Sequence, residues 1–250
     1  MTRRSRPLAI DLYCGLGGWT EGLLAEDYYV VGFDIERHLY GEHRYPAQLV
    51  LQDVLTLNGS QFRDATLIVA SPPCQEYSYM AMPWSRAKAM AAEYRNGARD
   101  VKKLTALFDA CFRIQREAIE ITGHFIPLVV ENVRGAQPWV GRSRWNFGSY
   151  HLWGDVPALM PMTNKHNTTS GKGQNPDGRK GVPHRPSGHW TNPEENGTKQ
   201  GGDWFNASQP SISRMCGSKS SARKAASAQI AKIPLLLARY IARTYREESP

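Results

Sequence analysis

Short apolar runs, separated by polar and glycine-containing stretches, mark the first 130 residues of the chain. Five of these runs have the length and composition of buried strands. They cover residues 8–13, 30–34, 49–51, 67–70 and 126–130. Helix-compatible patterns lie between them, at about residues 19–25 and 101–121. Because strands that alternate with helices form parallel sheets covered on both faces, we expect an α/β fold.

The fourth and fifth of these runs each end at a chemically reactive side chain. One continues into VASPPCQ at residues 69–75, and the other is VVENV at residues 129–133. Cys74 and Glu131 are 57 positions apart, which leaves room for a crossover helix between neighbouring parallel strands. The sequence therefore predicts one pocket faced by a thiol and a carboxyl group. The alternatives are a buried, inert cysteine for Cys74 and a helix-capping acid or salt-bridge partner for Glu131.

A glycine-rich loop, CGLGG at residues 14–18, follows the first expected strand. Glycines there let backbone amides approach a ligand, and Asp34 at the end of the next strand can accept hydrogen bonds from a ribose. Asp34 follows Gly15 by 19 residues, but the loop lacks the third glycine of the dinucleotide fingerprint. These features favour a mononucleoside cofactor over a nicotinamide. Asp34 and Asp53, taken singly, are equally consistent with strand-end or cap residues.

Three short motifs together resemble the ordered signature of the DNA cytosine-5 methyltransferases. They are DLYCGLGG at residues 11–18, PCQ at residues 73–75 and ENV at residues 131–133. The resemblance implies a Rossmann-like sheet that binds S-adenosylmethionine and releases S-adenosyl-L-homocysteine. It implies that the Cys74 thiolate adds to C6 of a flipped-out cytosine, because C5 alone is too weak a nucleophile. Glu131 would hold the N3 and N4 edge of the base, and Asn132 would fix the loop.

The resemblance also assigns cofactor contacts and a third catalytic residue. The residues expected at the cofactor are Asp11, Leu12, Tyr13, Gly15, Gly17, Gly18, Asp34, Ile35, Asp53, Val54 and Pro73. Residues 142–144 resemble the Gln-x-Arg-x-Arg strand of the family without its leading Gln, and we assign the base contact to Arg144 rather than Arg142. Residues 230–241 resemble the helix that returns to the cofactor side, but Ala228 and Gln229 replace the family's Gly-Asn pair.

The stretch from Gln75 to Arg99 stands where similar enzymes have a mobile catalytic loop. Its aromatic and arginine residues could fill the space left by an extracted base and close the pocket. Ser78 matches the family pattern, whereas Tyr77 stands where a Phe is usual. We expect Gln75, Ser78 and Arg86 to contact DNA. The alternative is that the apolar side chains of this stretch pack on the sheet.

Positive charge is concentrated late in the chain. Residues 1–164 contain 17 Lys/Arg and 17 Asp/Glu, whereas residues 165–250 contain 14 and 6, which accounts for the whole net charge of +8. Such a concentration of positive charge favours binding to a phosphate backbone, because counterions are released when the charges meet. The alternative is a surface that keeps the protein soluble. Residues 160–210 hold 8 Gly, 6 Pro and 6 Asn without periodicity, typical of loops that lie in a DNA groove or of a disordered linker. The DNA contacts expected there are Lys172, Arg179, Lys180 and Arg185.

Composition limits the remaining possibilities. The cysteines at positions 14, 74, 111 and 216 show no CxxC spacing, and His184 and His189 lack the ligand spacing of a zinc site, so we expect no metal and no disulfide. No apolar run reaches the roughly 18 residues of a membrane span, and no signal-peptide pattern precedes the first strand. We expect a soluble, cytoplasmic and monomeric enzyme acting on double-stranded DNA.

Three parts are expected along the chain. Residues 1–155 would form the catalytic and cofactor-binding domain, residues 156–215 a small irregular target-recognition region, and residues 216–250 a helix that returns to the catalytic domain. Two other functions remain open: a cytosine-5 methyltransferase acting on RNA such as tRNA, and a noncatalytic cofactor-binding DNA protein.

Overall fold

A single seven-stranded sheet organises the protein. The computed structural model describes residues 6–77, 84–160 and 220–247. Its strand order is β3-β2-β1-β4-β5-β7-β6. The first five strands are parallel, and β7 and β6 complete the sheet in antiparallel pairing. The strands are β1 Leu8–Leu12, β2 Tyr29–Asp34, β3 Gln48–Leu51, β4 Ala65–Ala70, β5 Leu128–Asn132, β6 Trp145–Phe147 and β7 Tyr150–Gly154. The expected α/β, Rossmann-like fold is confirmed.

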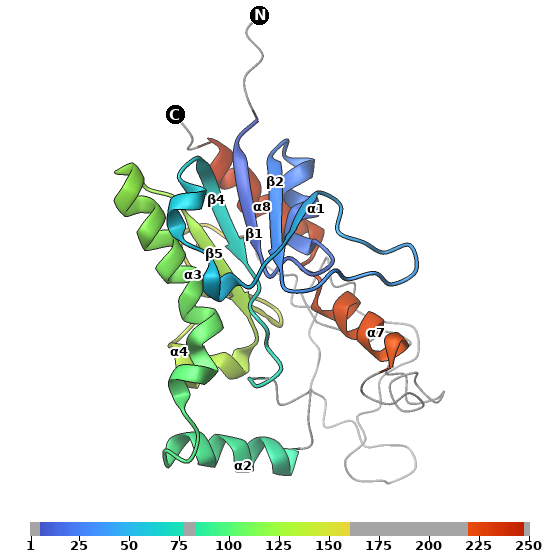
Figure 1. Ribbon diagram of the computed structural model, residues 1–250, viewed down its shortest axis with the longest axis vertical. Helices are drawn as coiled ribbons and strands as arrows, with labels where there is room; N and C mark the ends of the chain where they lie inside the picture. The colour runs from blue at the N-terminus through green and yellow to red at the C-terminus, as the bar shows by residue number, and fades with distance from the viewer. Residues whose placement is uncertain (1–5, 78–83, 161–219, 248–250) are drawn as a thin grey trace, which may run out of the picture.

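Helices cover both faces of this sheet (Figure 1). One face packs on α3, and the other packs on α1 and α8. The helices are α1 Gly18–Ala25, α2 Trp84–Arg95, α3 Val101–Thr122, α4 Gln137–Val140, α7 Ser221–Ala231 and α8 Leu235–Glu247, with 3-10 helices η1 Val54–Thr56, η2 Gly59–Phe62 and η3 Arg134–Ala136. None of the helices in the described ranges is long and apolar enough to cross a membrane.

Local sequence explains the longest helix. The side chain of Asp100 accepts a hydrogen bond from the backbone of Lys102 at the start of α3, and Gly123, with a φ of 70°, ends the helix. The buried residues of α3 recur every three or four positions, so one stripe faces the sheet. This helix is the crossover between β4 and β5 that the sequence predicted, and it makes the two strands parallel neighbours.

The helix α8 packs against α1 on one face of the sheet. It packs so closely on α1 that a Cβ at Gly22 would lie 2.4 Å from the Cβ of Ala238. Glu26, which follows the last residue of α1, pairs with Arg239 and Arg243 of α8, and these arginines hold the pKa of the Glu26 carboxyl below its usual range. The glycine and the ion pairs together fix α8 on the sheet, although exposed arginines limit what each pair contributes.

Residues 84–95 correct one expectation. They were expected to belong to a mobile loop, but they form the helix α2, since alanine, lysine and arginine dominate this stretch and its next glycine is Gly97. The Tyr94 ring contacts Trp139 of α4, with 5.4 Å between the ring centroids. Figure 1 shows α2 beyond the edge of the sheet to which β1, β4 and β5 point. Most of the expected target-recognition region lies outside the described residues, and the division into three parts stays a prediction.

Candidate active site

Strand register brings the candidate residues to one edge of the sheet. Leu12 of β1 pairs with Ala70 of β4, and Ala70 pairs with Val130 of β5. β1 and β4 therefore end at the same level, and β5 continues two residues further to Asn132, at the carboxyl edge where ligands bind in such sheets. The backbone of Ser71 prolongs the pairing by donating to the Leu12 carbonyl at 3.1 Å. Glu131 and the segment that leads to Cys74 thus lie side by side.

Asn132 links these two segments directly. Its side-chain amide donates a hydrogen bond of 2.9 Å to the carbonyl oxygen of Pro72, two residues before Cys74. Its side-chain oxygen accepts the backbone N–H of Val133 at 2.8 Å, so the amide is used at both ends. Asn132 is fully buried, which makes the hydrogen bonds costly to lose. The expectation that Asn132 fixes the loop is confirmed.

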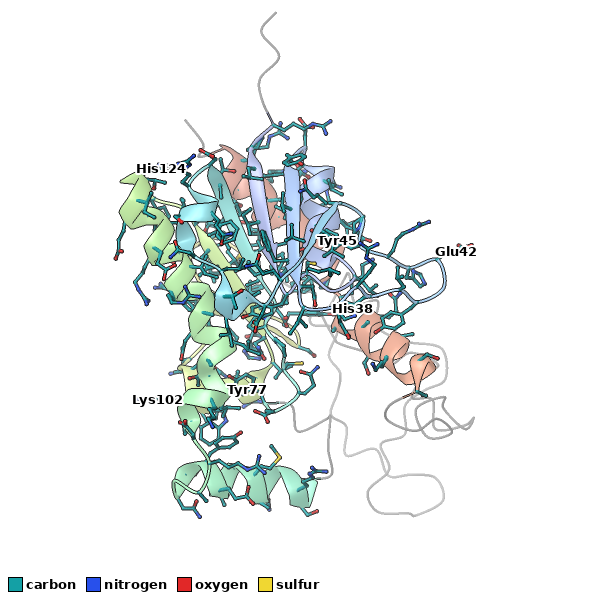
Figure 2. All side chains as sticks on the ribbon, viewed as in Figure 1. His38, Glu42, Tyr45, Tyr77, Lys102 and His124 are labelled. Carbon is teal, nitrogen blue, oxygen red and sulfur yellow. The ribbon has the colours of Figure 1, made fainter. Side chains whose placement is uncertain are left out.

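Tyr77 anchors the other end of the same loop. Its backbone N–H donates to the Cys74 carbonyl at 3.0 Å, and its hydroxyl donates to the Leu104 carbonyl of α3 at 2.7 Å. Figure 2 shows Tyr77 beside α3 at the carboxyl edge. The phenylalanine that is usual at this position lacks the hydroxyl and could not bond to Leu104. The tyrosine therefore gives the loop an additional hydrogen bond to α3. Burial raises the pKa of Tyr77 far above its usual range, which keeps the hydroxyl a donor.

The two reactive side chains differ in exposure. Cys74 is partly exposed on its anchored loop, whereas Glu131 is 4% exposed and lies in β5. Cys111 is fully buried in α3, where burial raises the pKa of its thiol above the usual range, as expected for a core cysteine. Cys14 is also buried, and Cys216 lies outside the described residues. Among the described cysteines, Cys74 is the most accessible to a ligand at this edge.

The glycine loop presents an open face beside Asp34. Gly15 has a φ of 52°, and its N–H donates to the Asp34 carboxylate at 2.9 Å. A Cβ at Gly15 would meet nothing within 4 Å, so this part of the loop is open to a ligand. Gly17 and Gly18, whose cofactor contact stays a prediction, are also close to other parts of the protein, because a Cβ there would lie 2.6 Å from Pro46 and 2.4 Å from the backbone of Ile233. Their small size is needed for packing within the protein.

Asp34 is held as a carboxylate at the end of β2. Burial raises its pKa, but hydrogen bonds from His38 and from the backbone of Gly15 and Glu36 outweigh that effect and lower the pKa below its usual value. The Nε2 atom of His38 lies 3.4 Å from the carboxylate, and the same contact raises the pKa of His38. Figure 2 shows His38 on the segment that follows β2. Each carboxylate oxygen can accept more than one hydrogen bond, so Asp34 keeps capacity for a hydroxyl ligand.

Asp11 is a buried acid with an unused oxygen. Its Oδ2 atom accepts a hydrogen bond of 2.6 Å from Thr20, which also lies 2.7 Å from the hydroxyl of buried Tyr45. Its Oδ1 atom is buried without a partner among the described residues. Burial, and to a lesser degree the negative charge of Asp34, raise the pKa of Asp11 to about 7, although the Thr20 hydrogen bond opposes the shift. A cationic or hydrogen-bond-donating ligand would satisfy this oxygen.

The other expected cofactor residues fall into two groups. The side chains of Leu12 and Val54 are buried in the core, and the Tyr13 hydroxyl donates to the Leu107 carbonyl. The Asp53 side chain accepts a hydrogen bond from the N–H of Leu55 and caps η1. A cap residue was the alternative to a cofactor contact in the sequence analysis. Ile35 is 74% exposed and Pro73 is also exposed, so both side chains are free to meet a ligand. For all of these residues, cofactor contact stays a prediction.

Arg144 lies in a polar cavity of about 490 Å³ beside the carboxyl edge. The cavity is lined by Arg134, Gln137, Arg142, Ser143, Arg144, Trp145, Asn146, Gly148 and His151. Neither Cys74 nor Glu131 belongs to this lining, so contact of Arg144 with the base stays a prediction. Gln75 and Arg86 are exposed on the loop and on α2. The remaining expected DNA contacts, Ser78, Lys172, Arg179, Lys180 and Arg185, lie outside the described residues.

Sequence reasoning missed several residues around the site. Thr20, Tyr45 and His151 carry no motif of their own and become neighbours of the site only through folding. Arg134 did carry a signal, because it directly follows the ENV motif. No cluster of metal-ligating side chains occurs within the described part of the chain.

The chain is similar to a known protein family and to several solved structures. The model of the C-5 cytosine-specific DNA methylase family matches residues 8–136, and no curated protein sequence matches the chain. Among similar solved structures, a prophage-encoded candidate DNA modification methyltransferase of E. coli is 21% identical over 52% of this chain and 33% of its own, with a TM-score of 0.34. The Dnmt2 methyltransferase of S. pombe is 17% identical over 55% of this chain and 37% of its own, with a TM-score of 0.33.

The methyltransferase EhMeth of Entamoeba histolytica is 13% identical over 64% of this chain and 56% of its own, with a TM-score of 0.37. The chain thus spans between a third and somewhat more than half of the length of these structures.

The hydrogen bond from Asn132 to Pro72 generates a stability prediction. Asn132→Ala leaves a buried carbonyl without its donor, so we expect the free energy of unfolding to fall by about 1–3 kcal/mol. Asn146→Ala is the matched control, because its amide makes a similar 3.0 Å bond to the Gly148 carbonyl at an exposed position. The control should change stability by less than about 0.5 kcal/mol in denaturant titrations. Equal losses in the two variants would contradict a special role for Asn132.

The raised pKa of Asp11 predicts a pH dependence of stability. Because the folded-state pKa is about 7 against 3.8 for an ordinary carboxyl, the folded state binds the proton more tightly. The stabilising contribution of this proton to the free energy of unfolding is therefore fully present below pH 3.8 and is lost as the pH rises through about 7.

Asp11→Asn removes this dependence while it keeps the shape of the side chain. The unfolding free energy of wild type minus that of Asp11→Asn should fall between about pH 4 and pH 7 and level off above, as measured by denaturant titration at each pH. A difference that rises with pH would refute the raised pKa.

Proposed function

The chain belongs to the C-5 cytosine-specific DNA methylase family, and on this premise we propose that it transfers a methyl group from S-adenosylmethionine to C5 of a flipped-out cytosine in duplex DNA. The observation that carries the proposal is the hydrogen bond from Asn132 to Pro72. It fixes the loop of Cys74 to the strand of Glu131, so that a nucleophile and an acid are held at one edge of the sheet. A noncatalytic DNA-binding protein has no need of this arrangement.

Cys74 supplies the electrons for the reaction. Its thiolate forms a bond to C6 of the cytosine, and the electron pair of the C5–C6 double bond moves to C5 and into the ring. C5 then forms a bond to the methyl carbon while the carbon–sulfur bond of the donor breaks. A base removes the C5 proton, the double bond returns, and the bond between Cys74 and C6 breaks. The products are 5-methylcytosine, S-adenosyl-L-homocysteine and the Cys74 thiolate, and the base holds the proton that left C5.

Glu131 acts on the opposite edge of the same ring. Charge arrives at N3 when the thiolate adds to C6, and a carboxyl group beside N3 and N4 stabilises it by hydrogen bonding and proton donation. Glu131 suits this role because it is buried and lies in β5, paired with Leu152, so its backbone cannot move away from the base. Burial also strengthens the interaction, since little water screens it.

The residues at the ends of β1 and β2 fit the proposed cofactor. Bound S-adenosylmethionine would supply a methyl group made electrophilic by its sulfonium centre. The open backbone at Gly15 offers space, the Asp34 carboxylate can accept hydrogen bonds from a ribose, and exposed Ile35 can cover an apolar ring. The unpaired oxygen of Asp11 suits the ammonium group of the amino-acid portion. The proposed cofactor site and the Cys74 loop meet where Ser71 pairs with Leu12.

Covalent trapping tests the role of Cys74. A duplex library with 5-fluorocytosine in place of cytosine should become covalently attached to the wild-type protein in the presence of S-adenosylmethionine, because fluorine at C5 blocks the elimination step. Cys74→Ser should give no adduct on a denaturing gel, whereas Cys111→Ala, which removes a core thiol, should retain it. Trapping of Cys74→Ser at the wild-type level would overturn the mechanism. A parallel assay with tRNA distinguishes an RNA substrate from DNA.

Glu131→Gln tests the acid. The amide keeps the shape but cannot supply the proton or the charge, so kcat should fall by about 100-fold or more while KM for DNA changes little. Glu120→Gln, at an exposed position on α3, is the control and should leave kcat unchanged. Steady-state kinetics with labelled methyl donor give both constants. A change confined to KM would make Glu131 a binding residue instead.

A further inference from the structure

A series of hydrogen bonds joins Tyr45 to Asp11 of the proposed donor site. The Thr20 hydroxyl donates to Oδ2 of Asp11 at 2.6 Å, and the Tyr45 hydroxyl lies 2.7 Å from the same Thr20 oxygen. Asp11 belongs to β1, Thr20 to α1, and Tyr45 to the segment between β2 and β3. Side chains therefore connect three segments that are separate in the sequence.

The chemistry of the three groups fixes the direction of these bonds. A carboxylate only accepts hydrogen bonds, and a hydroxyl has a single proton to donate. When Asp11 is ionised, the Thr20 proton is used on Oδ2, so the Tyr45 hydroxyl must donate to Thr20. Burial raises the pKa of Tyr45 far above its usual range, which keeps its hydroxyl protonated and able to donate.

Burial makes each bond of the series costly to lose. Asp11, Thr20 and Tyr45 are all buried, so little water is present to replace a missing partner. Successive hydrogen bonds in such surroundings polarise and strengthen one another. Removal of the Tyr45 hydroxyl would therefore weaken the bond from Thr20 to Asp11 as well as its own.

Two glycines leave the space in which the Tyr45 ring lies. A Cβ at Gly32 of β2 would lie 2.3 Å from the ring, and a Cβ at Gly17 would lie 3.1 Å from it. Figure 2 shows Tyr45 beside β2, the strand that ends at Asp34. The segment that begins after the proposed ribose acid thus returns over the glycine loop and brings a hydroxyl to the series that ends at Asp11.

The two oxygens of Asp11 are used differently. Oδ2 accepts the bond from Thr20, whereas Oδ1 is buried without a partner among the described residues. A carboxyl group that rotated freely would exchange the two oxygens, and the bond from Thr20 prevents this exchange. A donated bond also favours the ionised form of the carboxyl, which is the form that attracts an ammonium group.

We propose that Tyr45 is a positioning residue for the amino-acid portion of the methyl donor: through Thr20, it keeps Asp11 ionised and oriented, with Oδ1 left for the ammonium group. The inference rests on the proposed function, because it takes S-adenosylmethionine as the ligand. Tyr45 acts in this role without contact to the donor. Its effect on binding therefore depends on whether the ligand carries the ammonium group.

The experiment compares two ligands and two buried tyrosines. S-adenosyl-L-homocysteine contains the amino-acid portion, and 5′-methylthioadenosine lacks it. Tyr45→Phe removes the donated bond and keeps the ring. Tyr28→Phe is the matched control, because Tyr28 is also buried and its hydroxyl donates to the Ala242 carbonyl at 2.9 Å. Tyr28 precedes β2, at the opposite edge of the sheet from Asp34.

Calorimetry with the full chain gives the affinity for each ligand. Tyr45→Phe should weaken the binding of S-adenosyl-L-homocysteine by about five- to tenfold, the usual effect of one lost hydrogen bond, and leave 5′-methylthioadenosine near its wild-type affinity. Tyr28→Phe should leave both affinities unchanged. In methyl transfer, Tyr45→Phe should raise KM for S-adenosylmethionine by a similar factor, with kcat near the wild-type value.

Three results would overturn the proposal: an unchanged affinity of Tyr45→Phe for S-adenosyl-L-homocysteine, an equal loss for both ligands, or the same selective loss in Tyr28→Phe. If Tyr45→Phe does not fold, Thr20→Val interrupts the series at its centre and is judged by the same outcomes. A wild type that binds neither ligand refutes the proposed donor and this role together. A wild type that methylates DNA beside an equal loss for both ligands refutes only the role of Tyr45.

Discussion

The hydrogen bond from the Asn132 amide to the Pro72 carbonyl is the contact on which the candidate site depends. The thiol lies on a loop and the acid lies in a strand, so the distance between them is fixed only if the loop is fixed. Two prolines stiffen the segment before Cys74, and Tyr77 holds its far end to α3. The acid needs no such support, because β5 pairs on both of its sides. The site is thus a rigid strand joined to a loop that is held at both ends.

Charged side chains divide the carboxyl edge of the sheet into an acidic region and a cationic region, which suit different ligands. Near β1 and β2, Asp11 and Asp34 form an acidic region, and the raised pKa of Asp11 reflects burial next to a second carboxylate. Near β6 and β7, three arginines form a cationic cavity. A ligand with an ammonium group and a ribose suits the first region, and an anionic group suits the second. Cys74 and Glu131 lie between them, where a proposed donor and acceptor would meet.

The sequence pattern predicted the sheet because each strand and helix is marked by residues within its own segment. Apolar runs located β1 to β5, and the capping residues Asp100 and Gly123 delimit α3 at the expected place. The pattern was wrong for residues 84–95, where helix-forming residues outweighed the analogy to a loop. It did not foresee that Gly17 and Gly18 must also be small to admit Pro46 and Ile233. The cationic cavity was not foreseen, because the path of the chain through η3 and α4, which brings Arg134 near Arg142 and Arg144, has no signal in the sequence.

The central claim is that the thiol and the acid act on C5 of cytosine. The most direct measurement incubates duplex DNA with the protein and S-adenosylmethionine whose methyl group carries an isotope, digests the DNA to nucleosides and identifies the labelled product by mass spectrometry. The account predicts that the label appears in 5-methyl-2′-deoxycytidine. Label on the exocyclic nitrogen of cytosine or adenine would contradict it, because methylation at those atoms requires no covalent thiol adduct.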